Sequence, residues 1–266
     1  MKIALIGCGN MGQAILSAII SKGVSIAEHL SVAEVNQACR EMTAEKFGVF
    51  TTDNSVDAIR MSDIIILAIK PQNLDEAFKQ IGGKFSQGQL VISIIAGKCL
   101  GTLKDGLKYD AIVRAMPNTP AQIGYGMTVW TATEAVDGQQ MAQSRTILGA
   151  MGKEIYVSDE DSIDMATAIS GSGPAYVFLF MESLIQAAER IGLPHDKAYE
   201  MVMQLMSGSI RYAHSSDKPL DRLREMVTSP GGTTAAALGV FANGNLAGLV
   251  EEAVTAAYKR AKELGG

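Results

Sequence analysis

Short apolar runs alternate with amphipathic stretches through the first part of the chain. The first run is KIALIG, which ends abruptly in glycine, and it is followed by CGNMGQAILSAIISKG, in which apolar residues recur at helical spacing until Gly23. This order predicts a strand, a tight turn and a helix. The pattern then repeats: a second strand is predicted for HLSVAEV, ending near Glu34, and its following helix for NQACREMTAEKFG.

Later apolar runs predict further strands of the same sheet. They are DIIILAIKP, QLVISIIAG, AIVRAMPNTP, GMTVWTA and GKEIYVS. The first two are continuous in branched residues, which is typical of parallel strands buried on both faces. Strands that alternate with helices favour a doubly wound α/β sheet, whose ligands collect at the carboxyl ends of the strands. The sequence therefore predicts a Rossmann-type sheet domain over residues 1–158.

The remaining residues, 159–266, show helical periodicity and almost no strand signal. The predicted helices span 174–191, 195–214, 219–228, 233–241 and 246–264, and a helix from near Ile163 is broken by SGSG before a restart at Pro174. Several spans carry Met, Phe and Leu on more than one face, which is too apolar for a solvated helix. We therefore expect an all-α domain that buries these faces against a second copy of the chain. Folding of the helices back onto the sheet domain is the alternative.

Composition and charge narrow the class of partner. Hydrophobic residues make up 47% of the 266 residues and charged residues 19%, while 28 acidic and 23 basic side chains give a formal net charge of -5. A mildly acidic surface does not attract nucleic acid or an anionic membrane. No segment has the pattern of a signal peptide or the length of a transmembrane helix. We therefore expect a soluble cytoplasmic protein that binds neither nucleic acid nor a membrane.

The cysteines give no sign of a disulfide framework. They are Cys8, Cys39 and Cys99, an odd number without the spacing of metal ligands. Reduced thiols in a cytoplasmic protein are expected, with no metal site.

The turn after the first strand, Gly7-Cys8-Gly9-Asn10-Met11-Gly12, matches G-x-G-x-x-G directly before a helix. In this arrangement Gly7 permits the tight turn, Gly9 lets the backbone approach a pyrophosphate, and Gly12 lets the helix pack closely on the strand. The N-terminus of the helix then faces the phosphates. The sequence therefore predicts a dinucleotide site.

The side chain at the end of the second predicted strand bears on which dinucleotide binds. An NAD site places a carboxylate there for the ribose 2′-hydroxyl, whereas an NADP site prefers Ser, Thr, Asn or Arg. Glu34 therefore favours NADH, while Asn36 leaves room for NADPH. A solvated carboxylate at the strand end is the remaining interpretation of Glu34. The expected cofactor is NADPH or NADH.

A glycine-rich break interrupts the helical part at VTSPGGTTAAAL, residues 227–238. Pro230 and two glycines stop the preceding helix, and Thr233 and Thr234 precede a run of strong helix formers. A helix start of this kind leaves backbone N–H groups uncovered, which suits a carboxylate or a phosphate. A simple turn between helices is the alternative.

Five motifs occur in order along the chain: GCGNMG, AIKP at 68–71, RAMPNTPA at 114–121, SGSGPAYVF and SPGGTT. In these motifs the chain resembles the pyrroline-5-carboxylate reductase family over essentially its whole length. The resemblance implies an N-terminal NAD(P)-binding domain, a helical domain that interlocks with its twin into a dimer, and larger rings such as a decamer. It also implies hydride transfer, usually from NADPH, to the C=N carbon of 1-pyrroline-5-carboxylate. The product is L-proline, in the last step of proline biosynthesis.

The resemblance also assigns site residues by position. Together with Gly12 and Glu34 from the patterns above, the expected cofactor-binding residues are Ile6, Gly7, Cys8, Gly9, Asn10, Met11, Asn54, Ala68, Ile69, Lys70, Pro71, Ala96, Gly97, Pro117 and Asn118. The expected substrate-binding residues, which hold the carboxylate, are Ser229, Gly231, Gly232, Thr233 and Thr234. The hydroxyl of Thr234 is implied to lie near the ring nitrogen, which makes it the expected catalytic residue.

Catalysis is expected to proceed without a histidine acid. None of His29, His195 and His214 falls in a motif. A cyclic imine can arrive already protonated, so hydride delivery gives a neutral amine, and the site has only to hold the ring in alignment. Thr234 would then orient the substrate rather than titrate. Lys70 is an alternative proton donor, although its loop favours a contact with the cofactor ribose.

Two other functions fit part of the pattern. A β-hydroxyacid dehydrogenase-like oxidoreductase would share the order of domains but needs a catalytic lysine in the helical half. Lys197 and Lys218 lie there, outside the glycine-rich helix start. A non-catalytic protein that senses a dinucleotide would explain GCGNMG but would give SPGGTT no role.

Overall fold

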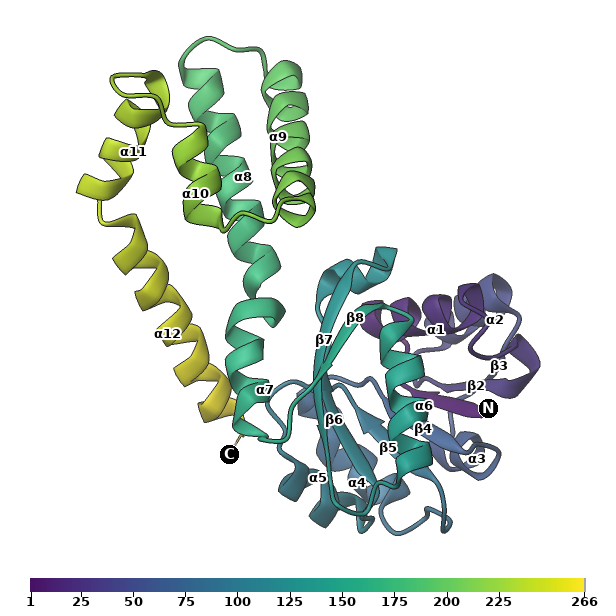
Figure 1. The fold of residues 1–266 in the computed structure, drawn as a ribbon. Helices are drawn as coiled ribbons and strands as arrows, with labels where there is room; N and C mark the ends of the chain where they lie inside the picture. The colour runs from purple at the N-terminus through teal and green to yellow at the C-terminus, as the bar shows by residue number, and fades with distance from the viewer. Residues whose placement is uncertain (266) are drawn as a thin grey trace. The chain divides into compact units, whose positions relative to one another are not determined.

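The computed structural model describes residues 1–265, which form two compact units (Figure 1). The first unit contains Met1–Pro174 and the end of the chain from Ala256, and the second contains Ala175–Thr255. The units therefore divide inside a helix. The division between residues 158 and 159, which we predict from composition, follows the last strand of the sequence and stays a prediction.

One eight-stranded sheet forms the frame of the first unit. Its strands are β1 (Ile3–Ile6), β2 (Leu30–Ala33), β3 (Phe50–Thr52), β4 (Ile64–Leu67), β5 (Leu90–Ser93), β6 (Ile112–Met116), β7 (Gly126–Ala132) and β8 (Gly152–Tyr156). Their order is β3-β2-β1-β4-β5-β6-β7-β8, and every neighbouring pair is parallel except β6 and β7. The crossovers to either side of β1 confirm the predicted doubly wound sheet.

The central strands end level with one another. Ile6 of β1 pairs with Ala33 of β2 on one side and with Leu67 of β4 on the other. Because the three strands are parallel, their carboxyl ends open onto the same edge of the sheet, at the point where the strand order reverses. The loops that follow β1, β2 and β4 are thereby brought together.

Successive residues of the strands face opposite layers of helices. Leu5 of β1 belongs to one core cluster with Leu16 of α1 (Asn10–Ser21), whereas Ile6 belongs to a second cluster with Ile59 of α3 (Ser55–Arg60). The other α-helices of this unit are α2 (Gln37–Phe47), α4 (Leu74–Ile81), α5 (Leu100–Leu107), α6 (Gly138–Gly149) and α7 (Asp161–Ala166). The predicted α1 and α2 are confirmed. The sequence patterns singled out neither β3 nor the helices from α3 to α6.

The predicted break of the helix at SGSG is wrong. α7 continues through a π-helical turn, Thr167–Gly171, into α8 (Gly173–Arg190), and the N–H of Ser172 donates to the carbonyl of Thr167 at 2.8 Å. The small residues widen one turn instead of ending the helix. Such π turns are frequent at functional sites.

A buried ion cluster joins the sheet to α7. The guanidinium of Arg114 on β6, whose side chain is 4% exposed, lies 2.8 Å from the carboxylate of Glu160 and 2.6 Å from that of Asp164. The carboxylate of Glu160 also accepts a hydrogen bond from the N–H of Leu100 at 2.7 Å, at the start of α5. These charge-assisted contacts fix the beginning of the helical segment on the sheet.

Helices make up the second unit, as predicted. They are α9 (His195–Ser215), α10 (Leu220–Met226), α11 (Thr233–Asn243), and most of α8 and α12 (Leu246–Gly265). Large apolar side chains are more than half exposed on these helices, among them Phe178, Leu179, Met201 and Leu205. Apolar exposure of this extent marks an interaction surface.

Within residues 1–265, one helical segment is long and apolar enough to cross a membrane. It covers the 30 residues of Asp161–Arg190, whose apolar part is 6% buried, and α11 and α12 reach that length and hydropathy only when taken together as a bent pair. The expectation that no segment reaches this length is therefore wrong. A helix face that a second copy of the chain covers has the same length and composition.

Candidate cofactor and substrate sites

A pocket of about 460 Å³ opens at the carboxyl ends of the central strands, and we name it the strand-end pocket. The predicted residues among its lining are Ile6, Gly7, Gly9, Glu34, Ala68, Ile69 and Lys70. The lining residues that sequence reasoning missed are Ala33, Val35, Asp53, Ser55, Gln72, Asn73, Glu76, Ala77 and Gln80. Their positions in the sequence could have indicated them, because each lies at or after the end of β2, β3 or β4.

The glycine-rich turn has the shape that a pyrophosphate needs. Gly7 has a φ of +92°, and an added Cβ there would lie 2.8 Å from the carbonyl oxygen of Ala68. An added Cβ at Gly12 would lie 2.6 Å from the carbonyl oxygen of Gly7, so side chains are excluded at both positions. An added Cβ at Gly9, by contrast, would meet no atom within 4 Å. The free space beside Gly9 therefore fits a dinucleotide that passes close to the backbone.

The N-terminus of α1 presents its first turn without a side-chain cap. Its N-cap residue is Gly9, no side chain caps the helix, and the first turn contains no acidic residue. The predicted residues Asn10 and Met11 form this turn. The positive end of the helix dipole and its backbone N–H groups thus suit an anion such as a phosphate.

Cys8 contributes to the turn with its backbone, because its side chain lies in the core. The thiol is fully buried and accepts a hydrogen bond from the hydroxyl of Thr43 at 3.5 Å. Burial raises the pKa of the Cys8 thiol above its ordinary value of 9.0, and the hydrogen bond from Thr43 opposes part of this rise. All three cysteines are free thiols.

The rate of thiol alkylation tests whether Cys8 is buried. Because the thiolate is the form that reacts, we expect Cys8 of the folded protein to be alkylated by iodoacetamide at pH 8 at least tenfold more slowly than Cys99, which is partly exposed. In urea the two rates should converge. Peptide mass spectrometry over a time course gives both rates, and equal rates in the folded protein would contradict the burial of Cys8.

Glu34 lies directly beyond β2 and holds the turn in place. Its carboxylate accepts a hydrogen bond from the N–H of Cys8 at 2.9 Å and another from the N–H of Asn36 at 3.0 Å. The side chain of Asn36 is in turn the cap of α2, where it accepts from the N–H of Cys39. Glu34 is half-buried and its carboxylate is fixed by two backbone N–H groups, and its contact with a cofactor ribose stays a prediction. Asn36 is occupied as a helix cap.

Two further predicted residues begin short helices next to the pocket. Asn54 caps α3, because its side chain accepts a hydrogen bond from the N–H of Val56 at 3.0 Å. Pro71 opens the 3-10 turn η2 (Pro71–Asn73) directly after Lys70. Neither Asn54 nor Pro71 lines the strand-end pocket, whereas Lys70 does.

Four other predicted cofactor-binding residues also lie outside the lining of this pocket: Ala96, Gly97, Pro117 and Asn118. An added Cβ at Gly97, where φ is +68°, would lie 2.7 Å from the Cβ of Leu264, so the end of α12 lies against this loop. The side-chain amide of Asn118 donates to the carbonyl of Ser170 at 3.0 Å and accepts from the N–H of Met127 at 2.9 Å. Asn118 therefore secures the π-helical turn to the loop after β6, and contact of these four residues with a cofactor stays a prediction.

The loop before α11 repeats the features of the first glycine turn. Gly231 has a φ of +69°, the N–H of Gly232 donates to the carbonyl of Ser229 at 3.0 Å, and α11 begins at Thr233. The N-cap residue is Gly232, no side chain caps the helix, and its first turn holds no acidic residue. An added Cβ at Gly232 would collide with the hydroxyl of Ser229. The loop is therefore a compact turn that ends in a helix start suited to an anion.

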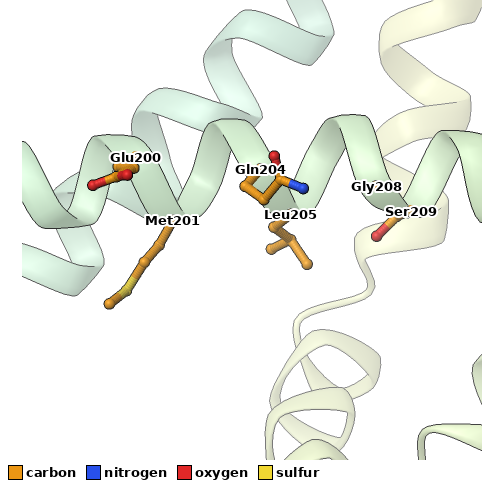
Figure 2. Close-up of a pocket in the computed structure, with 6 residues that line it drawn as sticks. All are labelled: Glu200, Met201, Gln204, Leu205, Gly208 and Ser209. Carbon is orange, nitrogen blue, oxygen red and sulfur yellow. The ribbon is translucent and has the colours of Figure 1, made fainter.

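A second cavity, of about 620 Å³, lies along the exposed side of α9, and Figure 2 shows the residues that line it. Met201 and Leu205 point to the same side of the helix, next to the small residues Gly208 and Ser209 (Figure 2). All six residues that line it belong to one helix, and none is a predicted site residue. This cavity is thus an uncovered apolar helix face rather than a place for chemistry.

Within residues 1–265, no group of three or more His, Cys, Asp or Glu side chains is placed to hold a metal ion. His195 and His214 each contact residues near them in the sequence. His195 pairs with Glu189 at 2.6 Å, and His214 contacts the carbonyl of Ile210 within its own helix.

Comparison with known proteins gives two family matches. Residues 160–264 match the family described as pyrroline-5-carboxylate reductase dimerisation, and residues 2–97 match the family described as NADP oxidoreductase coenzyme F420-dependent. Among curated proteins, the pyrroline-5-carboxylate reductase of Synechocystis is 36% identical over 265 residues, which are 100% of this chain and 98% of that protein.

Two solved structures agree with these matches. The structure of a pyrroline-5-carboxylate reductase from Coxiella burnetii has 37% identity and a TM-score of 0.89, and it covers 100% of this chain and 98% of its own. The crystal structure of Plasmodium falciparum pyrroline carboxylate reductase with NADP bound has 30% identity, a TM-score of 0.91 and the same coverage of both chains. With identities above 30% over its full length, and with the dinucleotide turn and the SPGGTT helix start in place, the chain belongs to the pyrroline-5-carboxylate reductase family.

Proposed function

We propose that this protein is an NAD(P)H-dependent pyrroline-5-carboxylate reductase, which reduces the C=N bond of 1-pyrroline-5-carboxylate to give L-proline. The observation that carries the proposal is the pair of uncapped helix starts, one at Gly9 in the first unit and one at Gly232 in the second. One suits the pyrophosphate of a dinucleotide and the other suits the carboxylate of a small substrate. Relatives named for this reaction match the whole chain.

The first unit binds the cofactor in this proposal. The N–H groups at the start of α1 hold the pyrophosphate, while Glu34 and Asp53 lie at the ribose end of the strand-end pocket. Lys70, which also lines the pocket, contacts the cofactor from the loop after β4. When bound, the reduced nicotinamide supplies the hydride.

The second unit binds the substrate. The backbone between Ser229 and Gly232 grips the carboxylate, and the hydroxyl of Thr234 orients the ring nitrogen. The iminium form of the substrate carries its proton on arrival, so one hydride at the ring carbon completes a neutral secondary amine, and no protein group has to donate a proton during that step. Alignment of the two reacting atoms is then the main task of the site.

Lys197 and Lys218 do not support a β-hydroxyacid dehydrogenase. Lys197 is surface-exposed and pairs with Asp196 and Glu200 of its own helix, and Lys218 pairs with its neighbour Asp217. A catalytic lysine has to reach the reacting carbonyl oxygen, whereas these side chains form local surface pairs.

An absorbance assay tests the proposed reaction. The protein is mixed with NADH or NADPH and 1-pyrroline-5-carboxylate, and loss of reduced nicotinamide is matched to proline formed, mole for mole. 1-Pyrroline, which lacks the carboxylate, is the control substrate and should react far more slowly because the helix start of α11 has no anion to hold. Turnover of a hydroxyacid with oxidised cofactor would instead support the dehydrogenase, and binding of a dinucleotide without any turnover would support a sensor.

The same proposal includes the assembly and its place in the cell. A dimerisation family match over residues 160–264, together with the exposed Phe178, Leu179, Met201 and Leu205, supports a homodimer through the helical region. Larger rings such as a decamer would be built from these dimers. We further propose a cytoplasmic protein that binds neither membrane nor nucleic acid, in which a second copy covers the apolar segment 161–190. Partition into the soluble fraction without detergent, and no sedimentation with phosphatidylcholine or phosphatidylglycerol vesicles, are the expected results.

The oligomeric state is a direct prediction of this proposal. An obligate dimer of this kind is expected to bury more than about 2,000 Å² of surface, so light scattering at micromolar concentration should show a dimer or a multiple of it. Dilution to nanomolar concentration should lower the melting temperature, because folding and association are coupled. A folded monomer at micromolar concentration would refute the assembly while leaving the cofactor pocket intact.

A further inference from the structure

Two carboxylates stand at the end of the strand-end pocket that follows β2 and β3. Glu34 and Asp53 both line it, and they belong to neighbouring parallel strands, since Ala33 of β2 pairs with Thr52 of β3. Each acidic residue comes directly after this pair. The edge of the pocket beside β2 therefore carries two negative charges, in the place where a Rossmann fold binds the adenosine ribose.

Glu34 is oriented before any ligand arrives. The N–H groups of Cys8 and Asn36 each hold one of its carboxylate oxygens, at 2.9 and 3.0 Å. A carboxylate has about four lone-pair sites, so two remain to accept hydrogen bonds from ribose hydroxyls. The geometry thus presents a fixed acceptor for a 2′-hydroxyl and a fixed negative charge toward a 2′-phosphate.

Arg40, the cation that pairs with Asp53, is already engaged in other contacts. Arg40 of α2 donates to the carbonyl of Glu34 at 2.7 Å and to the carbonyl of Val35 at 2.9 Å, and its guanidinium lies 3.9 Å from the carboxylate of Asp53. An arginine that receives a 2′-phosphate has to present free N–H groups to it. Arg40 does not line the pocket, and its contacts hold the chain after β2 in place.

From this arrangement we propose that Glu34 and Asp53 make the strand-end pocket selective for NADH over NADPH. The proposal rests on the proposed function only in that the pocket binds a dinucleotide. The 2′-phosphate of NADPH would carry up to two negative charges toward the carboxylates of Glu34 and Asp53. Arg40 is held by Asp53 and by two backbone carbonyls, and Lys70, which also lines the pocket, follows β4 rather than β2. The ribose of NADH would instead gain the hydrogen bonds that Glu34 offers.

Direct binding tests the proposal without turnover. Isothermal titration calorimetry gives the Kd of NADH and of NADPH for the parent protein and for four variants: Glu34→Ser, Asp53→Asn, Arg40→Met and Asp57→Asn. Asp57 is the matched control, because it is an exposed carboxylate four residues from Asp53 that does not line the pocket. Thermal melting of each variant shows that it is folded, which matters most for Glu34→Ser because Glu34 also supports the turn.

We expect the parent protein to bind NADH ten- to a hundredfold more tightly than NADPH. Glu34→Ser should weaken the binding of NADH, tighten the binding of NADPH and bring the two Kd values together. Asp53→Asn should tighten the binding of NADPH with little change for NADH, and Asp57→Asn should leave the ratio of the two Kd values as in the parent. Arg40→Met removes the cation that pairs with Asp53, so it should weaken NADPH binding by no more than a few-fold. Higher salt should narrow the gap between the two cofactors in the parent, since the repulsion is screened.

Several outcomes would overturn this selectivity. Equal or tighter binding of NADPH to the parent, a ratio that Glu34→Ser and Asp53→Asn leave unchanged, or a more than tenfold loss of NADPH binding specific to Arg40→Met would each do so. The last result would show that Arg40 turns to the 2′-phosphate. Binding of neither dinucleotide would overturn the proposed function as well, whereas binding with the wrong ratio would overturn the selectivity alone.

Discussion

Replacing Thr234 with alanine is expected to lower turnover ten- to a thousandfold while cofactor binding stays intact. In the proposed reaction the hydroxyl of Thr234 aligns the imine with the nicotinamide, and a misaligned substrate loses much of its rate. The Michaelis constant should rise less, because the backbone from Ser229 to Gly232 still holds the carboxylate. Steady-state kinetics with saturating cofactor, together with a calorimetric Kd for that cofactor, separate these effects.

The structure indicates that Thr234→Ala should leave the fold almost unchanged. α11 begins at Thr233 with Gly232 as its N-cap and without a side-chain cap, so neither threonine hydroxyl is needed to cap the helix. Alanine also has the higher helix propensity. We therefore expect the free energy of unfolding to change by no more than about 0.5 kcal/mol.

Thr233→Ala is the matched control, one residue away in the same turn. Thr233 is expected to hold the carboxylate through its backbone N–H, which alanine keeps, and its side chain is exposed whereas that of Thr234 is half-buried. Substitution at Thr233 should therefore leave turnover within a few-fold of the parent. If the two variants behave alike, or if Thr234→Ala retains parental kinetics, the hydroxyl does not orient the substrate. The loop would then be only a turn between helices.

Local sequence patterns predict most of the sheet because each of these strands is a short apolar run that can be recognised without its neighbours. Ile64–Leu67 and Leu90–Ser93 are continuous apolar runs, and parallel strands buried on both faces require that pattern. β3 has three residues, beginning with the exposed Phe50, and so carries little pattern. Asp53, which follows it, was missed for this reason.

The features that depended on distant residues were not predictable from local pattern. Glu34 was placed correctly at a strand end, yet its bond to the N–H of Cys8 joins residues 26 positions apart. The π-helical turn at 167–171 is held by Asn118, whose partner Ser170 is 52 residues away. Glycine and serine at that turn indicate a helix break when only local propensity is considered, and tertiary contacts override it.

The cluster at Arg114 is the clearest such case, and its disruption is expected to be strongly destabilising. Arg114→Met keeps an unbranched chain in the core but leaves the carboxylate of Asp164, whose side chain is 12% exposed, without its cation. Removing one partner of a buried ion pair typically costs about 3–5 kcal/mol, since the remaining charge is desolvated and uncompensated. We expect a loss of this size in the free energy of unfolding.

The chain contains its own probe and a matched control for this experiment. Trp130 is the single tryptophan, fully buried on β7 and paired with Ala115 of β6, so its fluorescence during urea unfolding reports on the sheet that holds Arg114. Lys104 and Asp110 form an ion pair with the same 2.8 Å separation as Arg114 and Glu160, but both side chains are more than half exposed. Lys104→Met should therefore leave the unfolding midpoint where it is, because water already solvates both partners.

A triple variant separates two costs of Arg114→Met: the loss of the guanidinium's own contacts, and the burial of carboxylates that have no cation. Adding Glu160→Gln and Asp164→Asn to Arg114→Met replaces the whole cluster with neutral groups, and much of the lost stability should return because no ion is left buried without a partner. If Arg114→Met unfolds at the parental midpoint, the cluster contributes no net stability to the sheet. If the triple variant is as unstable as Arg114→Met, the loss comes from the missing hydrogen bonds and packing of the guanidinium rather than from the uncompensated carboxylates.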